Sequence, residues 1–274
     1  MEPDSTNPLP AELPPQLPPL LPDALGEAQP SIPWARPAPP PSVRTPTGWD
    51  LLIALALIWG FELGGGFGIG VALMVANPGS DPTDVLTQHP VLMLSLSLIS
   101  LVFAVVVAWY FLCRKYRNRI AEEFALRAVR LRSILVSILL AVGGMLVAVC
   151  LIGDQEPGDS PLSQMVSTPL GALAFMAMAV IVPPLEELYY RGFLYSVLKK
   201  YTGTVAAVII VSAWFAGMHA FQLAGEWTGL AIVAVMGTIW TLQRCLTRSL
   251  IPSIVTHWLY NAMVVFVAPL LISP

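Results

Sequence analysis

The sequence predicts an all-α membrane protein, a polytopic bundle of transmembrane helices. Of its 274 residues, 56% are hydrophobic and only 11% are charged, whereas about a quarter of the residues in a soluble domain carry a charge. Several apolar stretches reach about 20 residues, the length that crosses a bilayer as a helix. These stretches are continuous and do not alternate between polar and apolar residues, which argues against a β-barrel.

About seven helices are expected to span the membrane. The apolar segments lie near residues 49–76, 91–113, 132–152, 170–198, 203–224, 228–246 and 250–271. Thirteen of the 14 Lys and Arg residues precede the first segment or lie in alternate connections or at the segment ends beside them, and the other connections contain none. Because Lys and Arg collect on the cytoplasmic side of membrane proteins, this separation predicts a cytoplasmic N-terminus.

Three regions differ in composition. Residues 1–46 hold 15 of the 26 prolines and are expected to form a disordered tail, because they bury too little apolar surface to fold. Its PxxP spacings can dock a protein partner, and a solvated tail is the alternative interpretation. Residues 47–167 are expected to form N-terminal transmembrane helices and a cytoplasmic loop, and residues 168–271 the helices that carry the ionisable residues of a candidate site. No basic cluster carries interleaved aromatic residues, so no nucleic-acid partner is expected.

The fourth segment contains the one basic residue that lies inside an apolar run, Arg191. Ionisable residues within a membrane are costly and are usually functional, with a partner nearby. Glu187 lies four residues earlier on the same helix face, so we expect an ion pair. Glu186 is rotated by about 100° and remains available for another role. The alternative is a purely structural pair with a protonated Glu186.

Two consecutive prolines, Pro183 and Pro184, precede these carboxylates. Because proline has no amide hydrogen, a continuous helix would leave the carbonyls of Ala179 and Val180 without their usual partners. We therefore expect a kink that opens space beside the carboxylates.

Two of the three histidines lie in later apolar segments. His219 closes the sequence Phe215-xxx-His219 in the fifth segment, and His257 opens His257-xxx-Asn261 in the seventh. Counting from the turn near residue 201, Glu186 and His219 lie at similar depth, about 20–25 Å into their helices. His257 is only about 10 Å into its helix, so its position agrees less well with a shared site.

These groups suit hydrolysis by an activated water. A carboxylate and an imidazole can jointly hold and deprotonate a water molecule, and an imidazole with an Asn amide can stabilise the oxyanion of a tetrahedral intermediate. Alternatively, Glu186, His219 and His257 can be zinc ligands with water in the fourth position. The chain has no HExxH sequence, and the spacing alone leaves both mechanisms open.

In their order and spacing, these motifs resemble the CPBP family, which comprises type II CAAX prenyl proteases and bacteriocin-processing or immunity proteins, also called the Abi family. The family is marked by EExxxR, FxxxH and HxxxN on successive transmembrane helices. The resemblance covers roughly residues 168–266 and is specific, because all three motifs occur in order, with Gly192 directly after Arg191.

The resemblance implies an intramembrane glutamic endopeptidase in a bacterial plasma membrane, acting on a membrane-associated protein or peptide. Glu186 and His219 would activate water, His257 and Asn261 would form the oxyanion hole, and Glu187 and Arg191 would support the site. We expect no cofactor, because Asn261 suits oxyanion donation and is a poor zinc ligand.

Two other classes of function stay open at this point. One is a non-catalytic membrane protein of the same fold, such as an immunity factor that binds a partner. The other is a transporter, which the absence of an inverted repeat of the charged motif disfavours.

Overall fold

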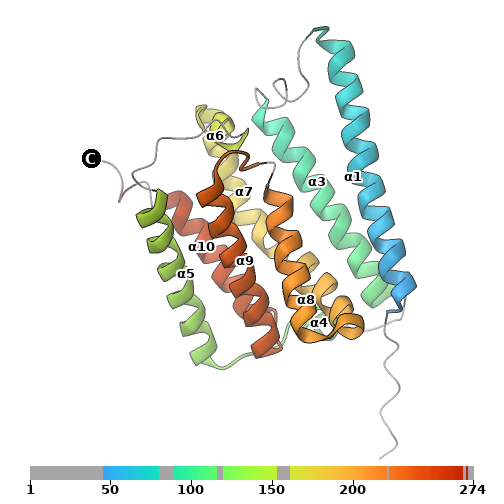
Figure 1. Cartoon of the computed structure of the whole chain (residues 1–274), viewed down its shortest axis with the longest axis vertical. Helices are drawn as coiled ribbons and strands as arrows, with labels where there is room; N and C mark the ends of the chain where they lie inside the picture. The colour runs from blue at the N-terminus through green and yellow to red at the C-terminus, as the bar shows by residue number, and fades with distance from the viewer. Residues whose placement is uncertain are drawn as a thin grey trace, which may run out of the picture. The chain divides into compact units, whose positions relative to one another are not determined.

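The computed structural model describes residues 46–79, 85, 89–115, 120–152, 161–220, 222–267 and 270, all within the compact unit Val43–Pro274. Apart from Pro46, the predicted proline-rich tail lies outside the described residues. All regular elements in the described part are helical (Figure 1). They are α1 (Gly48–Ala76), α3 (Pro90–Trp109), η1 (Tyr110–Arg114), α4 (Ile120–Glu123), α5 (Leu131–Ile152), α6 (Pro161–Val166), α7 (Pro169–Glu187), η2 (Leu188–Leu194), α8 (Tyr195–His219), α9 (Trp227–Thr247) and α10 (Ile251–Phe266).

Five helical runs in the described residues are long and apolar enough to cross a membrane: Gly48–Ala76, Val91–Arg114, Leu131–Ile152, Pro169–His219 and Trp227–Thr247. The run Pro169–His219 has 51 residues and is broken at Gly203, where φ is 80° and ψ is 173°. Two of the predicted segments meet at this break. The helix Ile251–Phe266 is apolar but has only 16 residues, fewer than the roughly 20 of a usual span. The all-helical fold is confirmed for the described residues, which contain five candidate membrane spans, whereas the count of seven and the cytoplasmic N-terminus stay predictions.

The start of α1 is fixed by a capping box. The Asp50 amide donates to Thr47 Oγ1 at 3.2 Å, and the Thr47 amide donates to the Asp50 carboxylate at 2.7 Å, which satisfies two groups that a helix start otherwise leaves unpaired. Asp50 is buried and forms a salt bridge with Lys115, directly after η1. The Lys200 ammonium in α8 donates to the Pro46 carbonyl at 2.9 Å. The entry to α1 is therefore tied to two other parts of the fold.

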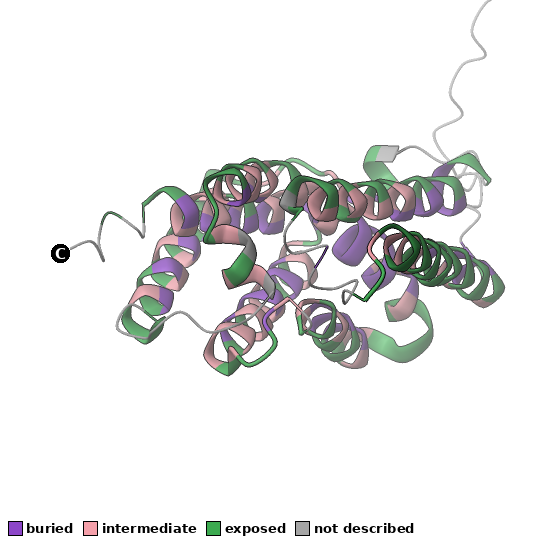
Figure 2. Cartoon of the chain, turned by 90° about the horizontal axis from the view of Figure 1, so that it is seen from above, coloured by how far each residue is buried: buried purple, intermediate pink, exposed green. Residues whose placement is uncertain are grey.

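Apolar side chains cover the outside of the helices as well as the core. Leu139 is 71% exposed and Ile209 is 62% exposed, although each lies in a run long enough to span a membrane. Figure 2 shows the buried positions on the sides where helices face one another and the exposed positions on the outer sides. In a bilayer, such outward apolar side chains contact lipid rather than water.

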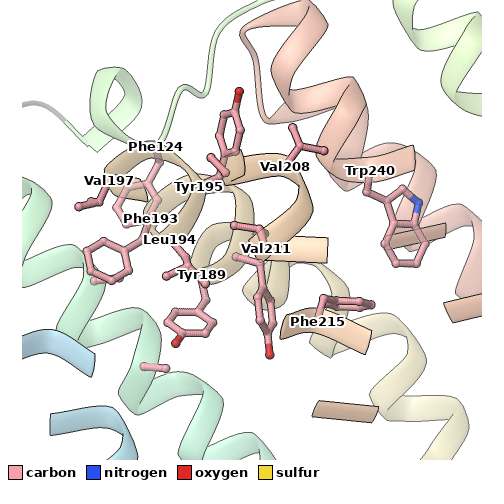
Figure 3. Close-up of a cluster of buried hydrophobic side chains, with 14 of the residues drawn as sticks. Phe124, Tyr189, Phe193, Leu194, Tyr195, Val197, Val208, Val211, Phe215 and Trp240 are labelled. Atoms are coloured by element: carbon pink, nitrogen blue, oxygen red, sulfur yellow. The ribbon is translucent and has the colours of Figure 1, made fainter. Parts of the chain in front are cut away.

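The helices that carry the predicted motifs pack together. Helix α10 contacts α5, α7 and α9, and α8 contacts α9 and η2. Figure 3 shows the aromatic and aliphatic side chains that fill the space around η2, among them Phe193, Phe215 and Trp240. Phe124, from the loop after α4, enters this cluster beside Gly192, where a Cβ atom would lie 2.6 Å from its ring. Gly192 thus leaves room for a ring that closes the core from the loop side.

Candidate active site

The two consecutive prolines leave a backbone carbonyl without its usual partner in the helix, and a tryptophan from another helix donates a hydrogen bond to it. The indole nitrogen of Trp258 in α10 donates to the Val180 carbonyl at 3.0 Å, the carbonyl that Pro184 cannot bond within the helix. The helix then continues as the π-helix η2 instead of a regular α-helix. Short π-helical stretches frequently occur at functional sites. The expected freed carbonyl at Val180 is confirmed, and it links α7 to α10.

The predicted pair of Glu187 and Arg191 is confirmed. Arg191 NH1 donates to Glu187 Oε1 at 3.0 Å, and both side chains are fully buried. The other guanidinium nitrogens are also bonded: Nε donates to Thr241 Oγ1 at 3.2 Å and NH2 to the Gly237 carbonyl at 2.8 Å. The guanidinium carbon lies 4.4 Å from the centre of the Phe215 ring. These partners offset the cost of burying a charge, which is large when a charge is left unpaired.

His257 joins the buried pair through the same carboxylate oxygen. Its Nδ1 lies 2.9 Å from Glu187 Oε1, and its ring stacks on Trp240 with centroids 3.6 Å apart and planes inclined by 15°. Since an ionised carboxylate only accepts hydrogen bonds, Nδ1 carries the proton in this contact. The opposite nitrogen, Nε2, lies 3.6 Å from Glu186 Oε2. Glu187 and Trp240 thereby aim His257 at Glu186.

His219 approaches the same glutamate from α8. Its Nδ1 lies 2.8 Å from the Phe215 carbonyl, to which it donates, and its Nε2 lies 4.0 Å from Glu186 Oε1. The side chains of His219 and Glu186 are 22% and 15% exposed, whereas that of His257 is 2% exposed. Glu186 and His219 therefore form the accessible edge of the cluster, and the remaining charged groups lie behind them.

The structure confirms the shared depth of Glu186 and His219, and it brings His257 to the same place. The mismatch expected for His257 is resolved by the turn between α9 and α10. Ser249 and Leu250 in that turn are buried, and the Leu250 amide donates to the Ala125 carbonyl at 2.9 Å. Because the turn lies beneath another loop, α10 begins inside the protein, and a short stretch of helix suffices to reach the carboxylates.

Asn261 lies one turn after His257 in α10 and is partly buried. Among the described residues its side chain has no hydrogen-bond partner, and it does not contact the carboxylates as the two histidines do. Helix geometry places it on the same face as His257, because the two are four residues apart. Of the six predicted residues, the structure brings five together, with separations of 2.9, 3.0, 3.6 and 4.0 Å between their charged or polar atoms, and leaves Asn261 at the margin of the cluster.

Sequence reasoning missed the contribution of α9, the helix between the second and third motifs. Trp240 stacks on His257, Thr241 and Gly237 bind Arg191, and all three are buried. A Cβ atom at Gly237 would lie 2.8 Å from the Phe215 ring and 3.4 Å from Arg191 NH2. The only signal in the sequence is the grouping of small and hydroxyl residues in an otherwise apolar helix.

The described residues do not gather three His, Cys, Asp or Glu side chains in a way that could hold a metal ion. In a tetrahedral zinc site with bonds of about 2.0–2.1 Å, the ligand atoms lie about 3.4 Å apart. The separation of 3.6 Å from His257 to Glu186 is close to this value, and the 4.0 Å from His219 to Glu186 is wider.

Comparison with known proteins gives one match. Residues 168–263 match the model of a family described as Type II CAAX prenyl endopeptidase Rce1-like, a protease family. The comparisons with curated proteins and with solved structures found no match. The matched region contains all six predicted site residues, and the five apolar helices together with this family indicate an integral membrane protein. Residues 168–263, the C-terminal helices of the chain, are thus similar to the Rce1-like type II CAAX prenyl endopeptidase family, in agreement with the resemblance that the three motifs carry.

Proposed function

We propose that the chain is an intramembrane endopeptidase that hydrolyses a peptide bond in a membrane-associated protein or peptide. The observation that carries this proposal is the convergence of two imidazoles on one carboxylate. His219 and His257 each direct Nε2 at Glu186, at 4.0 Å and 3.6 Å, while each Nδ1 is held elsewhere. A structural ion pair does not require this arrangement, but a site that must hold and deprotonate water does.

In the proposed first step, a water molecule binds between Glu186 and His219. Their separation of 4.0 Å is longer than a direct hydrogen bond and suits two groups that share a water. Because the Nδ1 proton of His219 is committed to the Phe215 carbonyl, its neutral ring presents a lone pair at Nε2. Glu186 takes one proton from the water, His219 orients it, and the oxygen attacks the peptide carbonyl. The proton on Glu186 then passes to the departing amine.

In the proposed second role, His257 and Asn261 stabilise the oxyanion. Since Nδ1 of His257 donates to Glu187, the ring can donate from Nε2 only when both nitrogens carry a proton. That charge state balances the site, because two carboxylates and the Arg191 guanidinium alone leave one negative charge uncompensated. Asn261 supplies the second donor through its amide once substrate is bound. Glu187 and Arg191 act as positioning residues that hold the His257 ring.

The substrate class proposed is a CAAX-type or bacteriocin-type precursor at a bacterial plasma membrane, with the N-terminus of the enzyme in the cytoplasm. The family match favours the CAAX type and offers no support for bacteriocin processing or immunity. We propose a metal-free mechanism. If purified active protein contains stoichiometric zinc and loses activity with a chelator, the zinc mechanism with Glu186, His219 and His257 as ligands replaces it.

The test compares protein termini in membranes of cells that carry the parental chain or Glu186→Gln. We expect a set of new termini that depends on the parental chain and disappears in Glu186→Gln and in His219→Gln. Glu123→Gln is the matched control: Glu123 lies outside the site, and burial together with the nearby Glu122 raises the pKa of its carboxyl, so a neutral amide is a mild replacement. If the termini are the same with Glu186→Gln as with the parental chain, the chain is a non-catalytic partner-binding protein.

A further inference from the structure

A second group of charged side chains lies away from the candidate active site, at the end of the helices where α9 stops. Arg244 is in the last turn of α9 and is half-buried. Its guanidinium carbon lies 5.4 Å from the centre of the Tyr195 ring, and Lys199 Nζ lies 5.7 Å from the same centre. Tyr195 is itself 1% exposed. Two cations thus flank one buried ring at the start of α8.

A third cation approaches from the loop before α5. Ser249, in the turn after α9, donates a hydrogen bond from its hydroxyl to the Arg127 carbonyl at 2.7 Å. Because Ser249 lies five residues after Arg244, this hydrogen bond brings the loop that carries Arg127 to the end of α9. None of the three cations forms a salt bridge with a carboxylate in the described part of the chain. The cluster of Arg127, Lys199 and Arg244 therefore holds positive charge without a carboxylate partner among the residues that the structure describes.

Several hydrogen-bond donors in this cluster are unused. Arg244 NH2 donates to Ser196 Oγ at 3.2 Å, but Arg244 Nε is buried and has no partner among the described residues. The Ser196 hydroxyl accepts that bond and still has its own proton to donate. A buried guanidinium nitrogen without a hydrogen-bond partner is unfavourable, and the only hydrogen-bond partner of Arg244 in the described residues is a neutral hydroxyl. A bound anion would supply the missing hydrogen-bond acceptor and a negative charge for the positively charged cluster.

We propose that Arg244, Lys199, Arg127 and Ser196 form a binding site for a phosphate group, either that of a lipid headgroup or free phosphate. A guanidinium fork with a hydroxyl and an ammonium presents several donors to one tetrahedral oxyanion, an arrangement that suits phosphate. Basic pockets between transmembrane helices at the end rich in Lys and Arg are typical sites for anionic headgroups. The site is distinct from the peptidase site, because Arg191 of η2 bonds to Gly237 and Thr241 of α9, whereas Arg244 lies in the last turn of α9 and bonds to Ser196 instead.

The experiment measures thermal stability of the full chain in nanodiscs with two probes. One arm replaces part of a phosphatidylcholine bilayer with phosphatidylglycerol, and the other adds inorganic phosphate to phosphatidylcholine nanodiscs. We expect at least one probe to raise the midpoint of unfolding, with an apparent affinity that Arg244→Gln weakens about tenfold or more, as the loss of a charge-assisted bond requires. Stabilisation by phosphatidylglycerol alone identifies a lipid headgroup, and stabilisation by inorganic phosphate identifies free phosphate.

Arg132→Gln is the matched control, because Arg132 is exposed near the same end of the helices and lies outside the cluster. It removes the same charge and should leave the response to both probes unchanged, which separates specific binding from general attraction of anionic lipid. Lys199→Gln removes an exposed member of the cluster and tests the site even if Arg244→Gln fails to fold. A parental response in Lys199→Gln, or in a folded Arg244→Gln protein, overturns the proposal, as does the absence of stabilisation by both probes.

Discussion

At Glu187, a single carboxylate oxygen accepts hydrogen bonds from both Arg191 and His257, at 3.0 Å and 2.9 Å. This residue therefore joins the buried cation to the imidazole that faces Glu186. A buried charge that loses its partner typically costs about 3–5 kcal/mol. Removing one member of the group should consequently affect stability as well as activity.

We expect Arg191→Met to lower the free energy of unfolding by about 3–5 kcal/mol, because it leaves Glu187 buried without its guanidinium. The double variant Glu187→Gln/Arg191→Met should lose less than the sum of the two single variants, since the residues are in contact. Chemical denaturation in detergent micelles measures both effects. Arg132→Met, at an exposed position, is the control, and a loss in Arg191→Met no larger than in this control would contradict the account.

The hydrogen bond from Trp258 to the Val180 carbonyl should also be measurable. Trp258→Phe keeps an aromatic ring but removes the indole donor, so we expect it to destabilise the protein by about 1 kcal/mol. Trp227→Phe is the comparison, because Trp227 is 76% exposed and its indole has no partner among the described residues. Equal melting temperatures of the two variants would mean that the freed carbonyl needs no partner from α10.

At the scale of the elements, helix α9 approaches α8 and η2 closely only because residue 237 is a glycine. A Cβ atom there would lie 2.8 Å from Phe215, so we expect Gly237→Ala to destabilise the fold by about 1–3 kcal/mol through overpacking. In Gly64→Ala the added Cβ meets no atom within 4 Å, and alanine favours the helix by roughly 0.5–1 kcal/mol. Thermal unfolding of the two variants should therefore shift in opposite directions, and shifts of equal sign and size would refute this explanation.

The contacts predicted correctly from the sequence follow from helix geometry. The pair of Glu187 and Arg191 is local, and the meeting of Glu186 with His219 follows from two helices joined by one turn. The roles of Trp240 and Thr241 could not be predicted, because they depend on how α9 is rotated against η2, and no motif marks that helix. The depth of His257 could not be predicted either. It depends on the turn before α10, which is held beneath the loop near Ala125 by a contact between residues distant in sequence.

At the scale of the whole molecule, the distribution of basic residues predicts which ends of the helices face the cytoplasm. Lys200 and Ala224 are exposed and lie before and after the second half of α8. In a cysteine-free background, Lys200→Cys should react with a membrane-impermeant maleimide only from the cytoplasmic side, and Ala224→Cys only from the opposite side. Labelling of both from the same side would show that residues 204–219 do not cross the membrane, and the reverse pattern would place the N-terminus outside.

The activity of the whole molecule shows whether the cluster of Glu186, His219 and His257 is catalytic. The most direct measurement uses a precursor protein whose terminus depends on the parental chain. Its rate of cleavage is measured with purified protein carrying Glu186→Gln, His219→Gln or both. Each single change should lower kcat by two to four orders of magnitude, and the double variant should be about as slow as the worse single one, because the two residues act on one water as a unit. Either single variant cleaving at the parental rate, or losses that multiply in the double variant, would contradict the proposal that Glu186 and His219 jointly activate water.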